Sequence, residues 1–236
     1  MQHTHLGQLV RSALLAEALA TTDSTTLARH LHHQRWEPGR IGLDSHQGCH
    51  GLYYVQHGRL ELVVTDSDGR ERALRLLSES DIFGLECLHP AMMPGGYQVR
   101  AITVSEVVAI HPELVDRWIN DMPKFRLDLA RHLASGIWSL ERERENTLSL
   151  PVTERLICYL RCGESCRRAP FREVAAARGP LPMQVLARRV GCSAGHLSRA
   201  VRGLLQEGVV QRVRGGLQVG DLSRFEGHLC EDCGIR

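Results

Sequence analysis

The sequence predicts an α+β fold, in which an N-terminal antiparallel β-roll is followed by a long central helix and a C-terminal winged helix-turn-helix. Three observations support this prediction. Short segments of alternating apolar and polar residues, separated by turn-forming residues, follow one another between residues 52 and 110. Apolar residues then recur at nearly heptad spacing after Pro123. Finally, residues 181–205 have the spacing of two short helices joined by a glycine turn.

The composition is that of an ordinary globular protein, with 43% hydrophobic and 24% charged residues in 236. This length suffices for one large domain or two small ones. The apolar segment Leu9–Leu19 contains Arg11 and Glu17, so we expect an amphipathic helix there and not a signal peptide or membrane span. We therefore expect a cytoplasmic protein without membrane contact. Its eight cysteines would then be reduced thiols, metal ligands or redox sensors.

The β-roll is assigned to residues 1–111. Helical spacing covers residues 6–33, broken by a threonine-rich turn at 21–26, and would place His30, His32 and His33 on a solvated helix surface. From Trp36 the pattern changes to the two-residue period of strands. The expected strands are Leu52–Val55, residues 60–64, Arg72–Leu77, Val99–Ile102 and Val107–Ile110.

The central helix is assigned to residues 112–150, with a short helical segment after Pro112 and a long one starting at Pro123. Four apolar residues form its predicted dimer seam: Leu129, Leu133, Ile137 and Leu140. The alternative is a single helix that packs only on its own roll. We favour the seam, because helix-turn-helix proteins usually bind two-fold DNA sites as homodimers. Pro151 is expected to end this helix.

The helix-turn-helix lies within the third assigned domain, residues 151–225, which a cysteine-containing tail of residues 226–236 follows. Gly191 falls at the turn, where a residue that tolerates positive φ is needed, and Ser193 can cap the second helix. A hairpin around Gly215 and Gly216 would form the wing. The alternative is an ordinary helical hairpin within a core. The candidate DNA-binding residues are Ser193, Gly195, His196, Ser198, Arg199, Arg202, Arg212 and Arg214.

Charge is distributed unevenly along the chain, although the formal net charge is only +2. Residues 151–236 contain 14 arginines, no lysine and 8 acidic residues, whereas residues 1–150 contain 15 basic and 19 acidic residues. The positive part of the chain is therefore the part with the helix-turn-helix, as binding to DNA phosphates requires.

Several stretches resemble the CRP/FNR superfamily of bacterial transcription regulators. They are YYVQHGRLELVV at 53–64, DSDGRERALRLL at 66–77, SDIFG at 80–84, ITVSEVVAIHPE at 102–113, TLSLPVTERLICYL at 147–160, and residues 181–219. The TLSL hinge and the AGHLSR segment are most similar to the nitrogen-oxide-responsive regulators of denitrification. The resemblance implies a cytoplasmic, homodimeric regulator that binds a palindromic operator in double-stranded DNA and contacts RNA polymerase.

The resemblance also assigns roles within the second helix of the motif. Family members commonly carry a Glu and an Arg there that contact base edges, and Arg199 matches the Arg. Gly195 occupies the Glu position and cannot contact a base through a side chain, so His196 and Ser198 are the remaining candidates. Arg202, Arg212 and Arg214 would contact phosphates.

No paired carboxylates, nucleophile elbow or phosphate-binding glycine loop occurs with the required flanks, so we expect no enzyme activity. The alternative function is a cyclic-nucleotide-type roll that acts as an interaction or regulatory module without binding DNA.

The signal is expected to be a gas or a redox change and not cyclic AMP. Members of the family that bind cyclic AMP hold its phosphate with an Arg-Ser or Arg-Thr pair, whose place here falls on Gly95-Gly96. Cys87 and His89 could be axial ligands of haem, the alternative being a buried thiol beside a surface histidine.

A second set of cysteines could bind a metal or an iron–sulfur cluster. Its members are Cys158, Cys162, Cys166, Cys230 and Cys233, the last two forming a CxxC pair. Their alternative state is reduced thiols. The N-terminal cysteine cluster of oxygen-sensing family members is absent, because the first cysteine is Cys49. A third candidate for thiol redox chemistry is Cys192 beside the second helix of the motif, although burial in the turn is the better interpretation.

Overall fold

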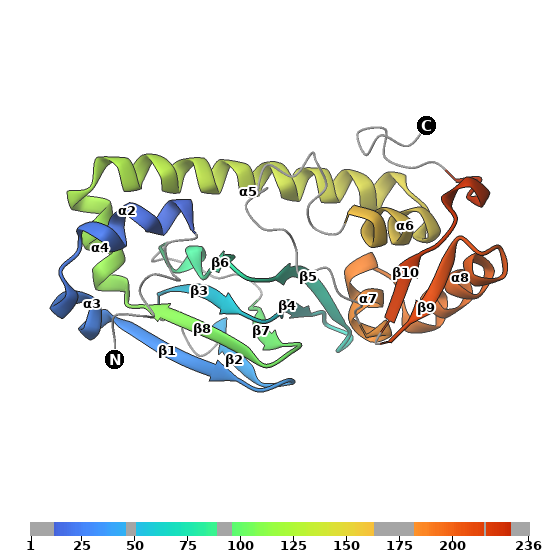
Figure 1. The fold of residues 1–236 in the computed structure, drawn as a ribbon, viewed down its shortest axis with the longest axis horizontal. Coiled ribbons are helices and arrows are strands. Elements are labelled where there is room, and N and C mark those ends of the chain that lie inside the picture. The colour runs from blue at the N-terminus through green and yellow to red at the C-terminus, as the bar shows by residue number, and fades with distance from the viewer. Residues whose placement is uncertain (1–11, 46–50, 89–95, 163–181, 215, 228–236) are drawn as a thin grey trace. The chain divides into compact units, whose positions relative to one another are not determined.

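The computed structural model describes residues 12–45, 51–88, 96–162, 182–214 and 216–227 (Figure 1). The chain divides into two compact units, residues 1–65 with 74–134 and residues 66–73 with 135–236. Two helices, α2 (Ala13–Thr21) and α3 (Ser24–His30), precede the strands of the first unit. Among the described residues, no helix has the length and apolar character needed to cross a membrane.

The β-roll consists of two four-stranded sheets whose assigned strand pairs are antiparallel. One sheet has the order β1 (Leu31–Trp36), β8 (Ser105–Ile110), β3 (Leu52–His57), β6 (Ile82–Phe83). The other has the order β2 (Ile41–Asp44), β7 (Gln98–Ala101), β4 (Leu60–Thr65), β5 (Glu71–Leu77). A 3-10 turn, Leu85–Leu88, follows β6. The five predicted strands are confirmed as β3, β4, β5, β7 and β8.

One hydrophobic core includes residues from both sheets. Trp36 is fully buried, and the rings of Tyr53 and Phe83 stack with centroids 4.9 Å apart. Gly42 lies against Trp36, since a Cβ there would come within 2.2 Å of the indole ring. Only glycine can occupy this position without moving the ring. The other core members are Leu43, Val55, Leu60, Leu77, Tyr97, Val99, Ala101, Val107 and Ala109.

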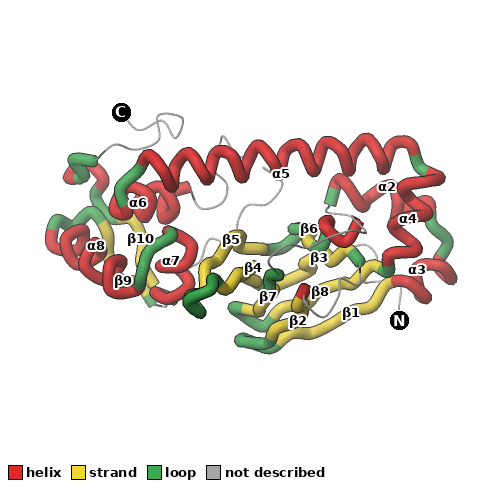
Figure 2. Tube along the Cα trace, turned by 180° about the vertical axis from the view of Figure 1, so that it is seen from behind, coloured by secondary structure: helices red, strands yellow, loops and turns green. Residues whose placement is uncertain are grey.

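A second core packs helices against the sheet that contains β8. It joins α2, α3, α4 (Pro112–Asp121) and the start of α5 (Pro123–Ser149) to Leu52, Val108 and Ile110. Trp118 of α4 is fully buried, and its indole nitrogen donates a hydrogen bond to Thr22 Oγ1 at 2.8 Å. The helices therefore cover one sheet and are fixed to it (Figures 1 and 2).

The prediction of helix as far as residue 33 is wrong. Helix α3 ends at His30, and Leu31–Trp36 is strand β1, paired with β8 from Leu31↔Ile110 to Trp36↔Ser105. Hydrogen bonds to a strand whose residues are 69 to 79 positions away decide the conformation, and the local spacing of apolar residues carries no information about them. His32 and His33 thus lie on a strand and not on a helix. Strands β2 and β6 were not predicted.

In the second unit, α6 (Val152–Cys162), α7 (Met183–Val190) and α8 (Ala194–Gln206) are followed by the hairpin β9 (Val210–Val213) and β10 (Gly216–Val219). A short 3-10 turn, Leu222–Arg224, comes next. Helix α5 begins at the predicted proline, and Pro151 separates it from α6, as expected.

His132 on α5 is a half-buried histidine whose charged form is disfavoured. Burial lowers the pKa of His132 to about 4, with a further contribution from the positive charge of Arg75. The unfolded chain has an ordinary histidine pKa of 6.5. Between these values the unfolded state binds more protons, so the histidine favours folding above pH 6.5 and loses this contribution as the pH falls toward 4.

We predict that His132→Gln weakens the pH dependence of stability between pH 7 and pH 5. With allowance for solvent screening, the wild type should lose about 1–2 kcal/mol through this group over that range, and the variant should not. Denaturation at both pH values measures the difference, with exposed His32→Gln as the control. An equal pH dependence in wild type and His132→Gln would contradict the assignment.

Candidate nucleic-acid interface

Helices α7 and α8 are joined by a turn that depends on Gly191. This residue has φ +72° and ends α7, and its N–H donates to the carbonyl oxygens of Ala187 and Arg188. The next N–H, of Cys192, also donates to the Ala187 carbonyl, at 3.0 Å. The left-handed residue lets the chain reverse while the last carbonyls of α7 stay hydrogen-bonded. The predicted role of Gly191 is confirmed.

Ser193 caps the N-terminus of α8. Its hydroxyl accepts a hydrogen bond from the His196 N–H at 3.2 Å, while its own backbone is extended, with φ −70° and ψ 153°. This satisfies one of the N–H groups that a helix start leaves without a partner. The predicted cap is therefore confirmed, and it fixes the direction in which α8 begins.

Both helices bury the apolar residues that their spacing singles out. Leu186 and Val190 of α7 and Leu197 of α8 are buried, together with Val201 and Leu204 one and two turns further along α8. Helix α6 contacts both helices and β10. This packing fixes α8 on its buried side and leaves the opposite side in solvent.

The exposed side of α8 and the hairpin carry all of the predicted DNA-binding residues. They are Ser193, Gly195, His196, Ser198, Arg199, Arg202, Arg212 and Arg214, and each is exposed. A Cβ added at Gly195 would have no atom within 4 Å. The surface at the start of α8 is therefore open and bears no side chain at this position.

The hairpin places two more arginines beside α8. Arg212 pairs with Leu217 across β9 and β10, and Arg214 follows β9 directly. Val210 and Leu217 are buried and attach the hairpin, and β9 contacts α8 (Figure 2). The hairpin thus has the position of a wing next to the second helix.

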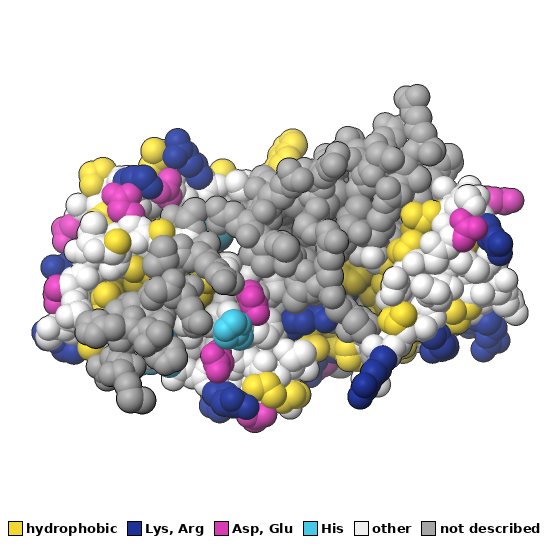
Figure 3. All heavy atoms as spheres, viewed as in Figure 1, with side chains coloured by type: hydrophobic (Ala, Val, Ile, Leu, Met, Phe, Trp, Pro, Cys, Tyr) yellow, Lys and Arg dark blue, Asp and Glu magenta, His cyan; other side chains and the backbone are white. Residues whose placement is uncertain are grey.

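The four exposed arginines give this surface a positive charge. Within the described part of the chain, no carboxylate forms an ion pair with Arg199, Arg202, Arg212 or Arg214. By contrast, Arg224 pairs with Asp221 at 3.1 Å. Arginine side chains, drawn in dark blue, are visible on the C-terminal elements in Figure 3. A polyanion such as duplex DNA could take all four guanidinium groups as partners.

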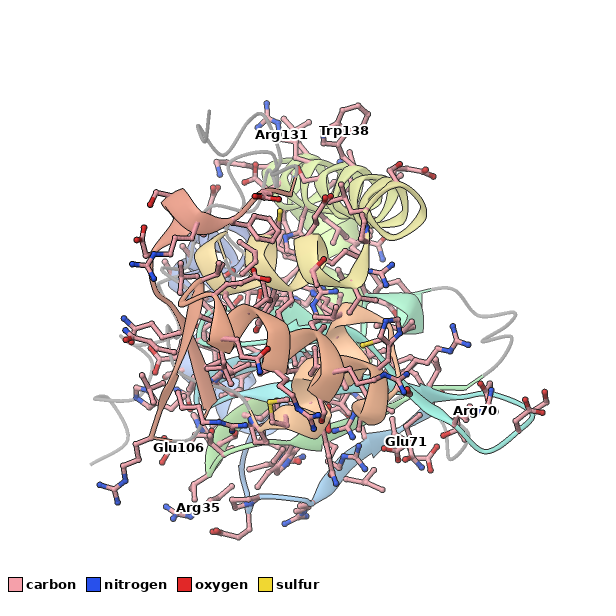
Figure 4. The ribbon with its side chains drawn as sticks, turned by 90° about the vertical axis from the view of Figure 1, so that its right-hand side faces the viewer. Arg35, Arg70, Glu71, Glu106, Arg131 and Trp138 are labelled. Carbon is pink, nitrogen blue, oxygen red and sulfur yellow. The ribbon has the colours of Figure 1, made fainter. Side chains whose placement is uncertain are left out.

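Helix α5 exposes an apolar stripe that contains two of the four predicted seam residues. Leu133 and Ile137, one helical turn apart, are exposed, Ile137 by 62%. Trp138 is 61% exposed and projects outward in Figure 4, but it lies about 100° around the helix from Ile137. Leu129 is only 7% exposed, because it packs in the helix-covered core of the first unit. The side chain of Leu140 lies outside the described residues. Trp138 was missed because only residues at heptad spacing were counted.

Most of the candidate effector residues lie outside the described part of the structure. Cys87 lies in the turn Leu85–Leu88, but its side chain and His89 are outside the described residues. Cys158 is half-buried on α6, and Cys162 ends that helix. The side chain of Cys162 and the residues Cys166, Cys230 and Cys233 are not described. Burial raises the pKa of the Cys192 thiol, against weaker opposing effects of Arg155 and the Leu197 backbone, so its environment disfavours a thiolate.

The chain is similar to known proteins over most of its length. Residues 34–121 match the cyclic nucleotide-binding domain family. The cAMP-activated global transcriptional regulator CRP of Pasteurella multocida is 23% identical over 73% of this chain and 82% of its own. Such regulators are not enzymes, in agreement with the expectation from the sequence.

Two solved structures show the same fold. A putative transcriptional regulator of the crp/fnr family from Eubacterium rectale aligns with a TM-score of 0.70 and 19% identity over 90% of this chain and 95% of its own. The c-di-GMP responsive global regulator CLP of Xanthomonas campestris aligns with a TM-score of 0.64 and 20% identity, over 84% of this chain and all of its own.

We predict opposite effects for one substitution at two glycines of this site. Gly191→Ala should destabilise the module by about 1 kcal/mol, because alanine disfavours positive φ although space for its methyl group exists. Gly203→Ala, within α8 and equally open, should stabilise it by about 0.5–1 kcal/mol. Hydrogen exchange of the α7 and α8 amides measures both. The same sign at both positions would contradict the assigned turn.

Proposed function

Since the chain is a member of the CRP/FNR superfamily, we propose that it is a sequence-specific DNA-binding transcription regulator whose dimer responds to a signal received in the β-roll. The observation that carries this proposal is the exposed face of α8. That face combines a capped helix start, an arginine in the family's base-contacting position and a surface without carboxylate partners in the described residues. In the alternative function, an interaction module without DNA binding, this face would have no evident use.

In the proposed complex the start of α8 enters the major groove. Arg199 donates two hydrogen bonds to O6 and N7 of a guanine, and His196 and Ser198 contact neighbouring base edges. Arg202 on α8 and Arg212 and Arg214 on the hairpin contact phosphates and set the position of the helix. Because Gly195 presents no side chain, the operator half-site should lack the base preference that a glutamate gives to relatives.

We further propose that two copies associate along the exposed stripe of α5. A helix-turn-helix dimer presents two reading helices about one DNA turn, or roughly 34 Å, apart, which requires a palindromic operator. The seam would contain Leu133, Ile137 and Leu140 from the predicted set, whose spacing places them on one face of the helix, whereas Leu129 serves the core of its own subunit. We also propose that the protein acts in the cytoplasm and contacts RNA polymerase.

The proposed signal is a gas or a redox change. The relatives differ here, since the CRP of Pasteurella multocida is activated by cAMP and the CLP of Xanthomonas campestris is responsive to c-di-GMP. In this chain Gly95-Gly96 replaces the pair that would hold a cyclic phosphate. Haem at Cys87 and His89, or a cluster on Cys158, Cys162, Cys166, Cys230 and Cys233, would supply the sensing chemistry. The absorption spectrum of protein purified without oxygen tests both against a colourless, metal-free chain.

We predict that Arg199→Ala removes base preference, whereas Arg202→Ala weakens binding to all sequences alike. The first step is selection of the preferred duplex from a random pool, with protein prepared both with and without oxygen. Arg199→Ala should then lose about 1–3 kcal/mol on that duplex and much less on random DNA. Arg202→Ala should lose a similar amount on both and reduce the salt dependence.

Two results would count against this proposal. Equal losses of Arg199→Ala on selected and random DNA would make Arg199 a phosphate contact. Failure to enrich any two-fold symmetric sequence under either condition, and with cAMP, c-di-GMP or haem added, would favour the interaction module without DNA binding.

We predict that Ile137→Glu converts the dimer to a monomer. The substitution places a charge on the exposed stripe of α5, where desolvation in an interface would be unfavourable. Leu74→Glu is the matched control, because Leu74 is also an exposed leucine-sized residue but lies on β5. Sedimentation analysis should show monomer only for Ile137→Glu. A dimeric Ile137→Glu would exclude this part of α5 as the seam.

A further inference from the structure

Three potential metal ligands meet at one end of the β-roll, at a place that the proposed DNA binding does not involve. They are His30 at the end of α3, His111 directly before α4 and Glu113 in the first turn of α4. One donor atom from each lies within 4.8 Å of the other two. We propose that these residues bind a divalent transition-metal ion of the zinc type.

The pairing of β1 with β8 brings the two histidines together. Leu31 and Ile110 are the end pair of this ladder, and His30 and His111 are the next residues outward on the two strands. The ladder continues to them, because the His111 N–H donates to the His30 carbonyl at 2.9 Å. Their rings have centroids 5.8 Å apart. In Figure 1, α3 ends and α4 begins at this same end of the two strands.

A backbone hydrogen bond orients the ring of His30 for metal binding. Its Nδ1 lies 2.8 Å from the Thr26 carbonyl oxygen, which can only accept, so Nδ1 carries the proton. In the neutral form of this imidazole the lone pair is on Nε2, which lies 3.7 Å from Glu113 Oε2. Metal-binding histidines typically donate their second ring N–H to a carbonyl or carboxylate in this way.

His111 and Glu113 complete the donor set. His111 Nδ1 lies 3.9 Å from the same Glu113 oxygen. The hydrogen bond that this Nδ1 accepts from the Glu113 N–H is 3.4 Å long, which is longer than usual, so its lone pair can be redirected to a metal. Two imidazoles and one carboxylate are ligands that zinc accepts, and three protein ligands leave a fourth position for water.

The three donor atoms are further apart than the ligands of a bound zinc ion, but side-chain rotation can bring them close enough. Ligands at about 2.0–2.1 Å from zinc in a tetrahedron lie roughly 3.3 Å apart. The donor atoms, which lie within 4.8 Å of one another, therefore have to approach by at most about 1.5 Å. Glu113 is 78% exposed at its side chain and can move, whereas His30 is 21% exposed and is held by Thr26. Bound metal would link the end of α3 to the start of α4.

The test is titration of the full-length, reduced protein with Zn²⁺ in the presence of a competing chelator. Because the cysteines can also bind zinc, the informative quantity is the number of equivalents lost in variants. Glu113→Gln, His30→Asn and His111→Ser should each lose one equivalent or weaken it about tenfold or more. Serine retains a capping group at position 111, and Glu113→Gln changes only an exposed side chain. His32→Asn, an exposed histidine two residues from His30, is the matched control and should lose none.

Two further readouts identify the site. Co²⁺ bound at this site should give visible absorption without thiolate-to-metal charge transfer, and Glu113→Gln should remove that component. Zn²⁺ should raise the unfolding temperature of the wild type and of His32→Asn more than that of Glu113→Gln. A folded variant that combines Glu113→Gln, His30→Asn and His111→Ser provides the decisive comparison. If it binds as many equivalents as the wild type, or gives an unchanged cobalt spectrum, the proposal is overturned.

Discussion

The pairing of β8 with two partners is the constraint on which the rest of the first unit depends. This strand lies between β1 and β3, and its side chains alternate between two cores. Val107 and Ala109 belong to the core shared by the two sheets, whereas Val108 and Ile110 belong to the core under the helices. A shift by one residue would exchange the two sets, so the strand's two-residue period fixes register and layering together.

The same strand determines where the helices attach. The N–H of His111, the residue after β8, is bonded to the carbonyl of His30, the residue before β1, so α3 ends and α4 begins side by side. Trp118 and Leu114 of α4 then reach the core formed by Ile110 and Leu52. The start of α5 follows through Phe125 and Leu129, with the ring of Phe125 packed edge-to-face on Trp118. The start of α5 is consequently used within the subunit, whereas Leu133, Ile137 and Trp138, further along the helix, are exposed.

Features that depend on neighbouring residues could be predicted from the sequence, whereas features that depend on residues far away in the chain could not. The helix-turn-helix was predictable to the residue, because the positive φ of Gly191 and the cap at Ser193 depend on neighbours within five positions. Strand β1 was not, since its hydrogen-bond partners are on β8. The grouping of His30 with His111 and Glu113 is equally non-local, and it needs the β1–β8 register before it can be recognised. Leu129 failed as a seam residue because spacing cannot tell which of two apolar surfaces a helical residue meets.

The internal structure of the helix-turn-helix, α7 and α8, limits the ways in which a signal could control DNA binding in the proposed regulator. The turn at Gly191 and the cap at Ser193 are satisfied, and Leu197 and Val201 are buried, so nothing within α7 and α8 suggests a second arrangement of that pair. A signal can change DNA affinity only through a difference between two states of the protein. If the pair is rigid, the two states have to differ in how the two reading helices of the dimer are spaced. In the proposed dimer this spacing would be set outside the helix-turn-helix, by association along α5, and this helix begins in the core of the first unit. The proposed signal would therefore change the geometry of the dimer and leave the structure of each helix-turn-helix unchanged.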